Sequence, residues 1–526
     1  MSSAISRRAW LTGATGGLAL AALATGPLAG LSRAAARRSA TPKVLVIGLD
    51  GAGRLDRVKD ADTPTLDGLM AAGVTAPTSL YAEPMARTES APGWSTIITG
   101  VWPDKHGVKD NSFTGADYAT YPDVLTRIER ARPALRTYAV ASWGPIPDRI
   151  FSAEVDTRIA TPEAEYDKGT TARAVAELRN GNPDAVFVQL DNVDHAGHSS
   201  GAASQAYLDA LHTVDAQVGE LLAALAARPT HASEDWLVLV TADHGHTDPG
   251  GHGGATWAER QTFVIATGSG LPAGALRNDV KIVDIAATAL HHLGIPADPA
   301  WRLDGRPLHA SAVDDFDTLR PELGTAVDET GVGGSVLGFT HTPPAGWSVD
   351  NRTMGGGGVT EWRGWSFTTD EFWTKTAPGQ QRESNVRARG VFAVADGDEW
   401  SDKAVTGTFD STLSTPSWPL DGATTATLTY TTHYLQEGSQ KAEVLVSYDG
   451  APATPVKTYT ADAPARVETL ALTVPAGARS ARFHFRYTGG NDWYWAIDGV
   501  ALATGRPRPR SGIPPHRQEQ RRAPLT

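Results

Sequence analysis

The segment Lys43-Val44-Leu45-Val46-Ile47-Gly48-Leu49, followed directly by Asp50-Gly51, decides the fold. A short apolar run of this kind is typical of a strand buried on both faces of a parallel sheet. Similar apolar runs occur at residues 184–190 and 236–241, and helical patterns occur at residues 63–73 and 205–227. Alternating strands and helices predict an α/β fold with a mainly parallel sheet flanked by helices. In such sheets, ligands bind at the carboxyl ends of the strands.

The pattern of the sequence changes after residue 308. Helical periodicity disappears between residues 337 and 503, where short alternating runs are punctuated by Gly, Pro and Asp. Regularly spaced short strands predict an all-β sandwich. We therefore predict a signal peptide at residues 1–40, an α/β domain at 41–315, a linker at 316–335, a β-sandwich at 336–504 and a disordered tail at 505–526.

Composition limits the chemistry that the chain can perform. Cysteine is absent from the 526 residues, so any metal ion would be held by Asp, Glu and His. The net charge is -12, and residues 1–40 hold five arginines and no acid, so the remainder is five units more negative than the whole. A chain this acidic is a poor nucleic-acid scaffold binder, because such binding relies on Lys and Arg that neutralise phosphates. Positive charge for a phosphate-bearing substrate would come from bound metal ions.

The N-terminus has the layout of an export signal. Arg7 and Arg8 precede an uncharged stretch at residues 10–31 and small residues around Ala34-Ala35-Ala36. The paired arginines resemble those of a twin-arginine signal. A membrane anchor is the alternative, because the stretch is long enough to span, but it is rich in Gly and Ala and only mildly apolar. We expect a secreted or extracytoplasmic protein with no membrane segment in its mature form.

Four segments are rich in residue types that bind metal ions. They are Asp50; the segment from Ser90 to Gly100; the segment from Asp191 to His198; and the segment from Thr241 to His246, which is followed by His252. Three of the four begin where a parallel strand is expected to end, as the rule for α/β sheets requires.

Each residue type has a chemical reason to be present. Imidazoles and carboxylates suit zinc or a similar divalent ion, and two such ions can share the work of displacement at phosphorus. A serine is a weak nucleophile unless it is activated, for example by a metal ion. Each feature alone has an ordinary explanation: Ser90 as a helix N-cap, and His195, His231 and His246 as surface histidines. Their combination, in this order, favours a two-metal hydrolytic site.

Residues 43–308 resemble the alkaline-phosphatase superfamily, in its type I phosphodiesterase and nucleotide pyrophosphatase branch. The segment Ser90-Ala91-Pro92-Gly93-Trp94, with Pro103-Asp104-Lys105-His106-Gly107 after it, is similar to that branch's nucleophile segment. The resemblance implies Ser90 as nucleophile and Asn111 as a contact to a phosphoryl oxygen. It implies two divalent metal ions, with zinc favoured by the histidine-rich donors. One ion would be held by Asp194, His198 and His252, and the other by Asp50, Asp243, His244 and Ser90.

The sequence also departs from the family's pattern. Gly93 replaces an asparagine that is often found there. No acid near Gln189 matches the ligand of a third metal ion, which disfavours a magnesium-assisted monoesterase. Trp94 stands where sulfatase relatives need an arginine, which argues against sulfatase activity.

The predicted β-sandwich offers two interpretations. Residues 490–500 resemble the closing strand of jelly-roll modules found on secreted enzymes. Exposed aromatic residues would suit a glycan or cell-surface polymer as partner. Alternatively, the eight tryptophans between residues 337 and 503 fill a small β-core. The second interpretation is the one we favour.

These observations predict an exported, metal-dependent phosphoester hydrolase that acts through a phosphoserine intermediate on a phosphoester substrate. A phosphomonoesterase is the nearest alternative, because the same ligands serve both reactions. A secreted binding protein with a vestigial enzyme domain, or a mutase or transferase, are more distant alternatives. No ligand of the expected set is missing from the sequence, which argues against a vestigial site.

Overall fold

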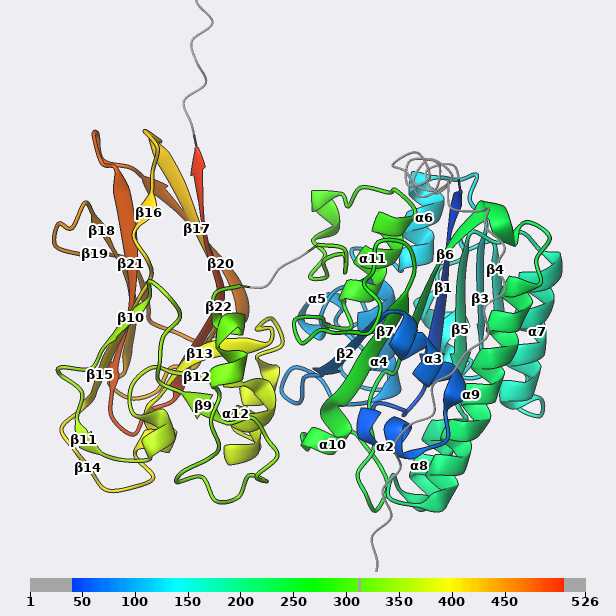
Figure 1. Ribbon diagram of the computed structural model, residues 1–526, viewed down its shortest axis with the longest axis horizontal. Helices are drawn as coiled ribbons and strands as arrows, with labels where there is room; N and C mark the ends of the chain where they lie inside the picture. The colour runs from blue at the N-terminus through cyan, green and yellow to red at the C-terminus, as the bar shows by residue number, and fades with distance from the viewer. Residues whose placement is uncertain (1–39, 311–313, 506–526) are drawn as a thin grey trace, which may run out of the picture.

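The computed structural model describes residues 40–310 and 314–505. The predicted signal peptide and disordered tail lie outside these ranges, apart from one residue of each. The first domain is built on an eight-stranded sheet in the order β4-β3-β5-β1-β6-β7-β2-β8 (Figure 1). Its strands are β1 (Thr41–Leu49), β2 (Val74–Ser79), β3 (Thr137–Ala141), β4 (Thr157–Ala160), β5 (Ala185–Leu190), β6 (Glu234–Thr241), β7 (Gln261–Thr267) and β8 (Ala275–Leu276).

The first strand lies at the centre of this sheet. Leu45 of β1 pairs in parallel with Val186 of β5 and with Val238 of β6. β3 and β4 continue the parallel arrangement on one side, whereas β7 runs antiparallel to both β6 and β2 on the other. The predicted α/β class with a mainly parallel sheet is confirmed.

Helices cover both faces of the sheet (Figure 1). They are α2 (Leu55–Asp60), α3 (Pro64–Ala72), α4 (Ser90–Thr99), α5 (Pro103–His106), α6 (Val124–Ala131), α7 (Tyr166–Asn180), α8 (Asn192–Ser200), α9 (Gln205–Ala226), α10 (Trp257–Arg260) and α11 (Asp284–His292), with short π or 3-10 turns η1 (Ile146–Ile150), η2 (His231–Ser233) and η3 (Pro299–Trp301). Alternate side chains of β1 pack on opposite faces of the sheet, because successive side chains of a strand point to opposite sides. Val44 and Val46 pack with α4, α6 and α11, whereas Leu45 and Ile47 pack with α3, α7 and α9.

The second domain consists of two main antiparallel sheets, as predicted. One has the order β10-β15-β21-β18-β19, with β16 beside β21, and the other has the order β20-β17-β22-β13-β12-β9. The strands are β9 (Phe339–Thr340), β10 (Ser348–Asp350), β11 (Gly356–Gly357), β12 (Ser366–Thr369), β13 (Val391–Asp396), β14 (Val405–Thr406), β15 (Phe409–Ser414), β16 (Trp418–Pro419), β17 (Thr425–Tyr434), β18 (Lys441–Tyr448), β19 (Thr454–Tyr459), β20 (Ala463–Thr473), β21 (Ser480–Gly489) and β22 (Tyr494–Gly505). The helical segments are α12 (Asp370–Thr376), α13 (Gly397–Trp400), η4 (Phe316–Glu322), η5 (Thr360–Trp362) and η6 (Arg382–Ser384).

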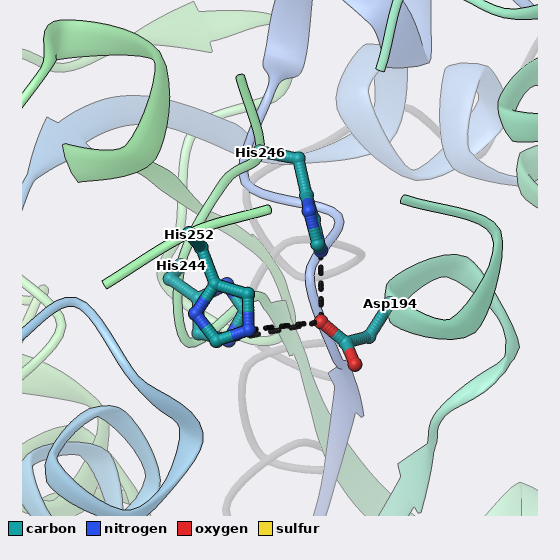
Figure 2. A group of neighbouring side chains, drawn as sticks. All are labelled: Asp194, His244, His246 and His252. Carbon is teal, nitrogen blue, oxygen red and sulfur yellow. Dashed lines mark hydrogen bonds and ion pairs between the residues drawn. The ribbon is translucent and has the colours of Figure 1, made fainter. Parts of the chain in front are cut away.

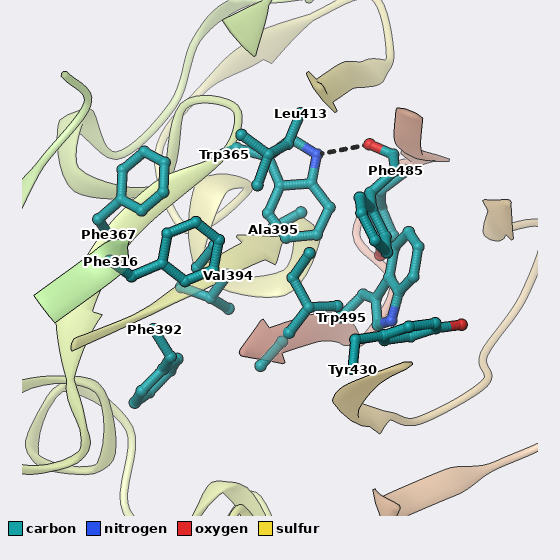
Figure 3. Packing of buried hydrophobic residues seen from close by; sticks show 14 of the residues in the cluster. Phe316, Trp365, Phe367, Phe392, Val394, Ala395, Leu413, Tyr430, Phe485 and Trp495 are labelled. Atoms are coloured by element: carbon teal, nitrogen blue, oxygen red, sulfur yellow. Dashed lines mark hydrogen bonds between the residues drawn. The ribbon is translucent and has the colours of Figure 1, made fainter. Parts of the chain in front are cut away.

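Aromatic side chains fill the core of the second domain. Six of its eight tryptophans are buried, among them Trp365 and Trp495, whose rings lie 5.4 Å apart (Figure 3). The indole of Trp365 donates a hydrogen bond to the carbonyl oxygen of Phe485 at 3.1 Å. This arrangement supports the interpretation of the tryptophans as core residues.

The segment at residues 316–335 does not behave as a free linker. Phe316 and Leu319 of η4, together with Leu323 and Val332, are buried in the aromatic core of the second domain. Sequence analysis predicted a linker there because a polar stretch leads to the glycines at residues 331–334. In the structure the segment packs as part of the second domain.

The two domains pack against each other through buried charges. Arg389 pairs with Asp284 at 2.6 Å, and Arg260 pairs with Asp370 at 2.8 Å, each across the boundary between the domains. Val386 of the second domain also joins the apolar cluster of the first. Within residues 40–310 and 314–505, no helix is both long and apolar enough to cross a membrane.

Candidate functional site

The candidate site lies at the carboxyl edge of the three central strands. Asp50 directly follows β1, Asp194 lies in α8 just after β5, and Asp243 follows β6. Ser90 is the first residue of α4, and His252 lies in the loop after β6. The structure thus brings together all the side chains that sequence analysis proposed as metal ligands, from segments spread over some 200 residues of the chain.

The first group of side chains is buried beneath Ser90. It consists of Asp50, Asp243 and His244, none of which is more than 1% exposed. His244 Nε2 lies 3.3 Å from Asp243 Oδ2 and 3.6 Å from Asp50 Oδ1. Ser90 Oγ lies 3.3 Å from His244 Nε2 and 3.4 Å from Asp50 Oδ1. The hydroxyl therefore faces the donor atoms of this group.

The second group surrounds Asp194 and consists of Asp194, His244, His246 and His252 (Figure 2). Asp194 Oδ1 lies 2.8 Å from His246 Nε2 and 3.5 Å from His252 Nε2. His198, one helical turn beyond Asp194, places its Nε2 3.0 Å from His252 Nε2. His244 belongs to both groups, so the two groups are contiguous.

His246 is the residue that sequence analysis missed. It was explained there as a surface histidine, but the structure buries it completely against Asp194, so that explanation is wrong. Two glycines make room for its ring: a Cβ at Gly197 would lie 2.5 Å from His246 Cδ2, and one at Gly51 would lie 2.8 Å from His246 Nε2. His195 and His231 are exposed, as their surface explanation requires.

Hydrogen bonds hold two of the imidazoles in position. His252 Nδ1 lies 2.7 Å from the carbonyl oxygen of Thr88, and His244 Nδ1 lies 3.2 Å from that of Gly245. A carbonyl can only accept, so each Nδ1 is the donor and each Nε2 keeps a lone pair. Metal-binding histidines commonly show this arrangement, because it fixes both the tautomer and the ring orientation.

Burial brings the carboxylates of the site close together. Burial, together with the charges of Asp243 and Asp194, raises the pKa of Asp50 well above its usual range. Burial likewise raises the pKa of Asp243 and lowers that of His244. Asp243 Oδ2 is buried and makes no hydrogen bond to any residue that the structure describes. Carboxylates and neutral imidazoles crowded in this way fit a divalent cation with N and O ligands.

The position of α4 explains why a glycine occupies residue 93, where the family often has an asparagine. A Cβ at Gly93 would lie 2.7 Å from the carbonyl oxygen of Asp243, so glycine permits α4 to approach the site. Asn111 Oδ1 accepts a hydrogen bond of 2.8 Å from the backbone N–H of Ala91, which fixes the Asn111 amide beside Ser90. Ser95, on the same helix, is instead bonded to Tyr118 at 2.7 Å.

Comparisons with known proteins find sequence similarity in the first domain. Residues 44–154 and 140–289 match the model of the type I phosphodiesterase / nucleotide pyrophosphatase family. Mouse ectonucleotide pyrophosphatase/phosphodiesterase family member 7 is 29% identical over 237 residues, which cover 39% of this chain and 50% of that protein. The phosphopentomutase of Methylobacterium radiotolerans is 34% identical over 197 residues, covering 36% and 43%. A solved structure of murine ectonucleotide pyrophosphatase / phosphodiesterase 5 gives a TM-score of 0.41 at 16% identity, covering 49% of this chain and 96% of that one.

The first domain is therefore an α/β domain with a contiguous Asp/His centre at the carboxyl edge of its sheet. In that domain, residues 44–289 match the type I phosphodiesterase / nucleotide pyrophosphatase family model, and ectonucleotide pyrophosphatase/phosphodiesterase family members are similar to 39% of this chain. The chain spans half or less of the length of the curated relatives described above.

Proposed function

We propose that the chain is an exported, metal-dependent phosphoester hydrolase of the phosphodiesterase type, acting through a phosphoserine formed on Ser90. The observation that carries the proposal is the position of Ser90 Oγ, 3.3 Å from His244 Nε2 and 3.4 Å from Asp50 Oδ1, at the start of α4. A hydroxyl facing such a donor cluster is placed for activation as a nucleophile.

The donor set divides between two ions. Asp50, Asp243 and His244, with Ser90, would hold one, and Asp194, His198 and His252 would hold the other, with His246 beside Asp194 as a further donor. The imidazole-rich set favours zinc. When bound, the ions would lower the pKa of the serine hydroxyl and stabilise the oxygen that departs.

Ser90 and Asn111 take part in a reaction of two displacement steps. Ser90 Oγ attacks phosphorus in line, and the bond from phosphorus to the leaving oxygen breaks as the new O–P bond forms. The Asn111 amide, held by Ala91 N–H, is placed to donate to a phosphoryl oxygen. Water then attacks phosphorus, the bond from phosphorus to Ser90 Oγ breaks, and Ser90 Oγ takes up a proton from the water. The two inversions leave the configuration at phosphorus unchanged.

Paired substrates test the proposal. The metal-loaded protein is assayed on bis(para-nitrophenyl) phosphate and on para-nitrophenyl phosphate, with acid quench and peptide mass spectrometry. We expect faster turnover of the diester and a phosphoryl group trapped on Ser90. Preference for the monoester would favour the phosphomonoesterase alternative. Transfer to an added alcohol in place of water would favour a transferase. Absence of turnover on both esters would refute the proposal.

Export is the second part of the proposal, and it rests on Arg7, Arg8 and the uncharged stretch after them. Replacing both arginines by lysine should hold the protein inside the cell if the twin-arginine assignment is correct. Unchanged export would contradict that assignment. We do not extend the proposal to a glycan ligand of the second domain, because most of its tryptophans are buried.

A further inference from the structure

A cavity of about 940 Å³ lies between the two domains. The first domain contributes the ends of β2 and β7, the helix α10 and Lys281, and the second contributes Arg320 and the start of α12. Ser79 at the end of β2 pairs with Gln261 at the start of β7, and β7 is the neighbour of β6. The cavity therefore opens at the same edge of the sheet as the candidate site. Neither Ser90 nor any proposed metal ligand is among the described residues that line it.

The acidic side chains that line the cavity are already paired. Asp56 and Asp248 each lie 2.8 Å from Arg54; Asp370 lies 2.8 Å from Arg260; and Glu371 lies 2.6 Å from Lys375. Each of these carboxylates is therefore in an ion pair with one basic side chain. The other cations that line the cavity form no ion pair with them.

Two cations of the cavity wall have no such partner. Lys281 is only 6% exposed, and among the described residues its ammonium makes no hydrogen bond or ion pair. Burial lowers the pKa of Lys281 to about 8. The charge of Asp370 opposes this shift, the charges of Arg389 and Arg260 add to it, and the charge of Asp284 opposes it more weakly. Arg320 is half-buried, and its guanidinium likewise has no hydrogen-bonded partner in the described part of the chain.

A buried cation without a partner is costly, and an anion that enters the cavity would relieve that cost. We propose that the interdomain cavity binds an organic oxyanion, whose phosphate, sulfate or carboxylate group contacts Lys281, with Arg320 as the second cation of the site. The site is separate from the hydrolytic centre and is formed only when both domains are docked.

The cavity has room for more than the charged group. Its volume is that of a site for a small organic molecule, which is usually several hundred cubic ångströms. Trp257 of α10 and Leu337, which is 37% exposed, supply apolar surface for the body of the ligand. Both features favour an organic anion over a free inorganic ion.

Labelling of Lys281 tests the proposal directly in the metal-loaded, full-length protein. An amine-reactive acetylating reagent is applied at mildly alkaline pH, and peptide mass spectrometry gives the labelling rate of Lys281 with exposed Lys59 as internal reference. The probes are benzenesulfonate, which joins an anion to an apolar body, and inorganic sulfate. Benzenesulfonate at ten times its dissociation constant should slow the labelling of Lys281 about tenfold and leave Lys59 unchanged. Sulfate should protect more weakly.

Variants separate this cavity from the hydrolytic centre. Arg320→Gln should weaken the protection by benzenesulfonate about tenfold in apparent dissociation constant and leave diester hydrolysis unchanged. The matched control is Lys403→Gln, which removes an exposed cation of the second domain that pairs with Asp328 and should leave protection unchanged. The proposal is overturned if the reagent does not label Lys281 or if neither probe slows that labelling. It is also overturned if benzenesulfonate protects Lys281 equally well in the Arg320→Gln and Lys403→Gln variants. Equal protection by sulfate and benzenesulfonate would overturn the organic part of the proposal.

Discussion

Trp94 donates a hydrogen bond of 2.7 Å from its indole Nε1 to Oδ2 of Asp50. Gln189 donates a second bond of 2.9 Å to the same oxygen, so Oδ1 is left to face Ser90. The indole fits because a glycine lies beneath it: a Cβ at Gly48 would lie 2.3 Å from Trp94 Cη2. The helix that carries the serine therefore also orients the first carboxylate of the site.

Trp94→Phe removes this donor and keeps an aromatic ring in the core. Partners of metal ligands typically contribute about 10- to 100-fold to activity or metal affinity, and we expect a loss of that size in kcat/KM. Trp102→Phe is the control, because Trp102 is buried in the same apolar cluster. Steady-state kinetics and metal analysis on both variants check the prediction, and an equal loss in both would contradict it.

Ser90→Ala should reduce turnover by at least about a thousandfold, since losing the nucleophile raises the barrier by about 4 kcal/mol or more. Metal content should change little, because the carboxylates and imidazoles remain. Ser90→Thr should retain activity, because threonine offers the same hydroxyl. Ser95→Ala, which removes a hydroxyl bonded to Tyr118, is the control and should stay active. A loss of only a few fold in Ser90→Ala would point to direct attack by water.

Gly197→Ala should act through His246. The added methyl group would meet the imidazole at 2.5 Å and displace it from Asp194. We expect Gly197→Ala and His246→Ala to lose metal to a similar degree, measured by elemental analysis after dialysis. His195→Ala, on the same helix but exposed, should keep its metal. Full metal content in His246→Ala would show that His246 is not needed to hold the ion.

His106 should make stability depend on pH. Its Nδ1 accepts a hydrogen bond from Val108 N–H, and burial lowers its pKa from 6.5 to about 3. Between these values the unfolded chain binds the proton and the folded chain does not. The folded state is therefore at its most stable, as far as His106 is concerned, above pH 6.5, and this contribution to the free energy of unfolding is lost as the pH falls towards 3. At pH 5 the loss is about 2 kcal/mol.

His106→Asn keeps an acceptor for Val108 but cannot titrate. Urea unfolding gives the free energy of unfolding at pH 7 and at pH 5. The decrease between these two values should be about 2 kcal/mol smaller in the variant than in the original protein. The same pH dependence in both proteins would exclude His106 as its source.

Arg389→Met tests the docking of the two domains. It leaves Asp284 buried without its partner, which typically costs about 3–5 kcal/mol. The double variant Arg389→Met/Asp284→Asn should recover part of that loss, because no unpaired charge remains. Denaturant unfolding of the original protein, the two single variants and the double variant measures the coupling, and additive losses would show that the pair contributes nothing.

The elements and residues that could be predicted from the sequence are those with a local signal. The pattern around Leu45 places β1 within two residues, and the apolar period of residues 205–227 predicts α9 nearly to its ends. The burial of His246 could not be read in this way, because it depends on Gly51 and Gly197, which are distant in the sequence. The spacing Asp243-His244-Gly245-His246 was the available signal, since a residue two positions after a ligand can return to the same site.

The antiparallel direction of β7 could not be predicted from the sequence either. The apolar residues 263–266 of β7 predict a strand, but not whether it runs parallel or antiparallel to its neighbour. The packing of residues 316–335 on the second domain depends on an aromatic core whose other members are spread to Ile497.

The central position of β1 has a consequence for synthesis on the ribosome. Val44 pairs with Ala185 and with Leu237, so β1 is flanked by strands that emerge from the ribosome much later. At typical elongation rates of about 5–20 residues per second, β1 waits roughly seven to thirty seconds for its first central partner. During that time an apolar strand with both edges free is exposed to aggregation. We expect the yield of this protein in a heterologous host to depend on the speed of translation and on chaperones that shield the nascent chain.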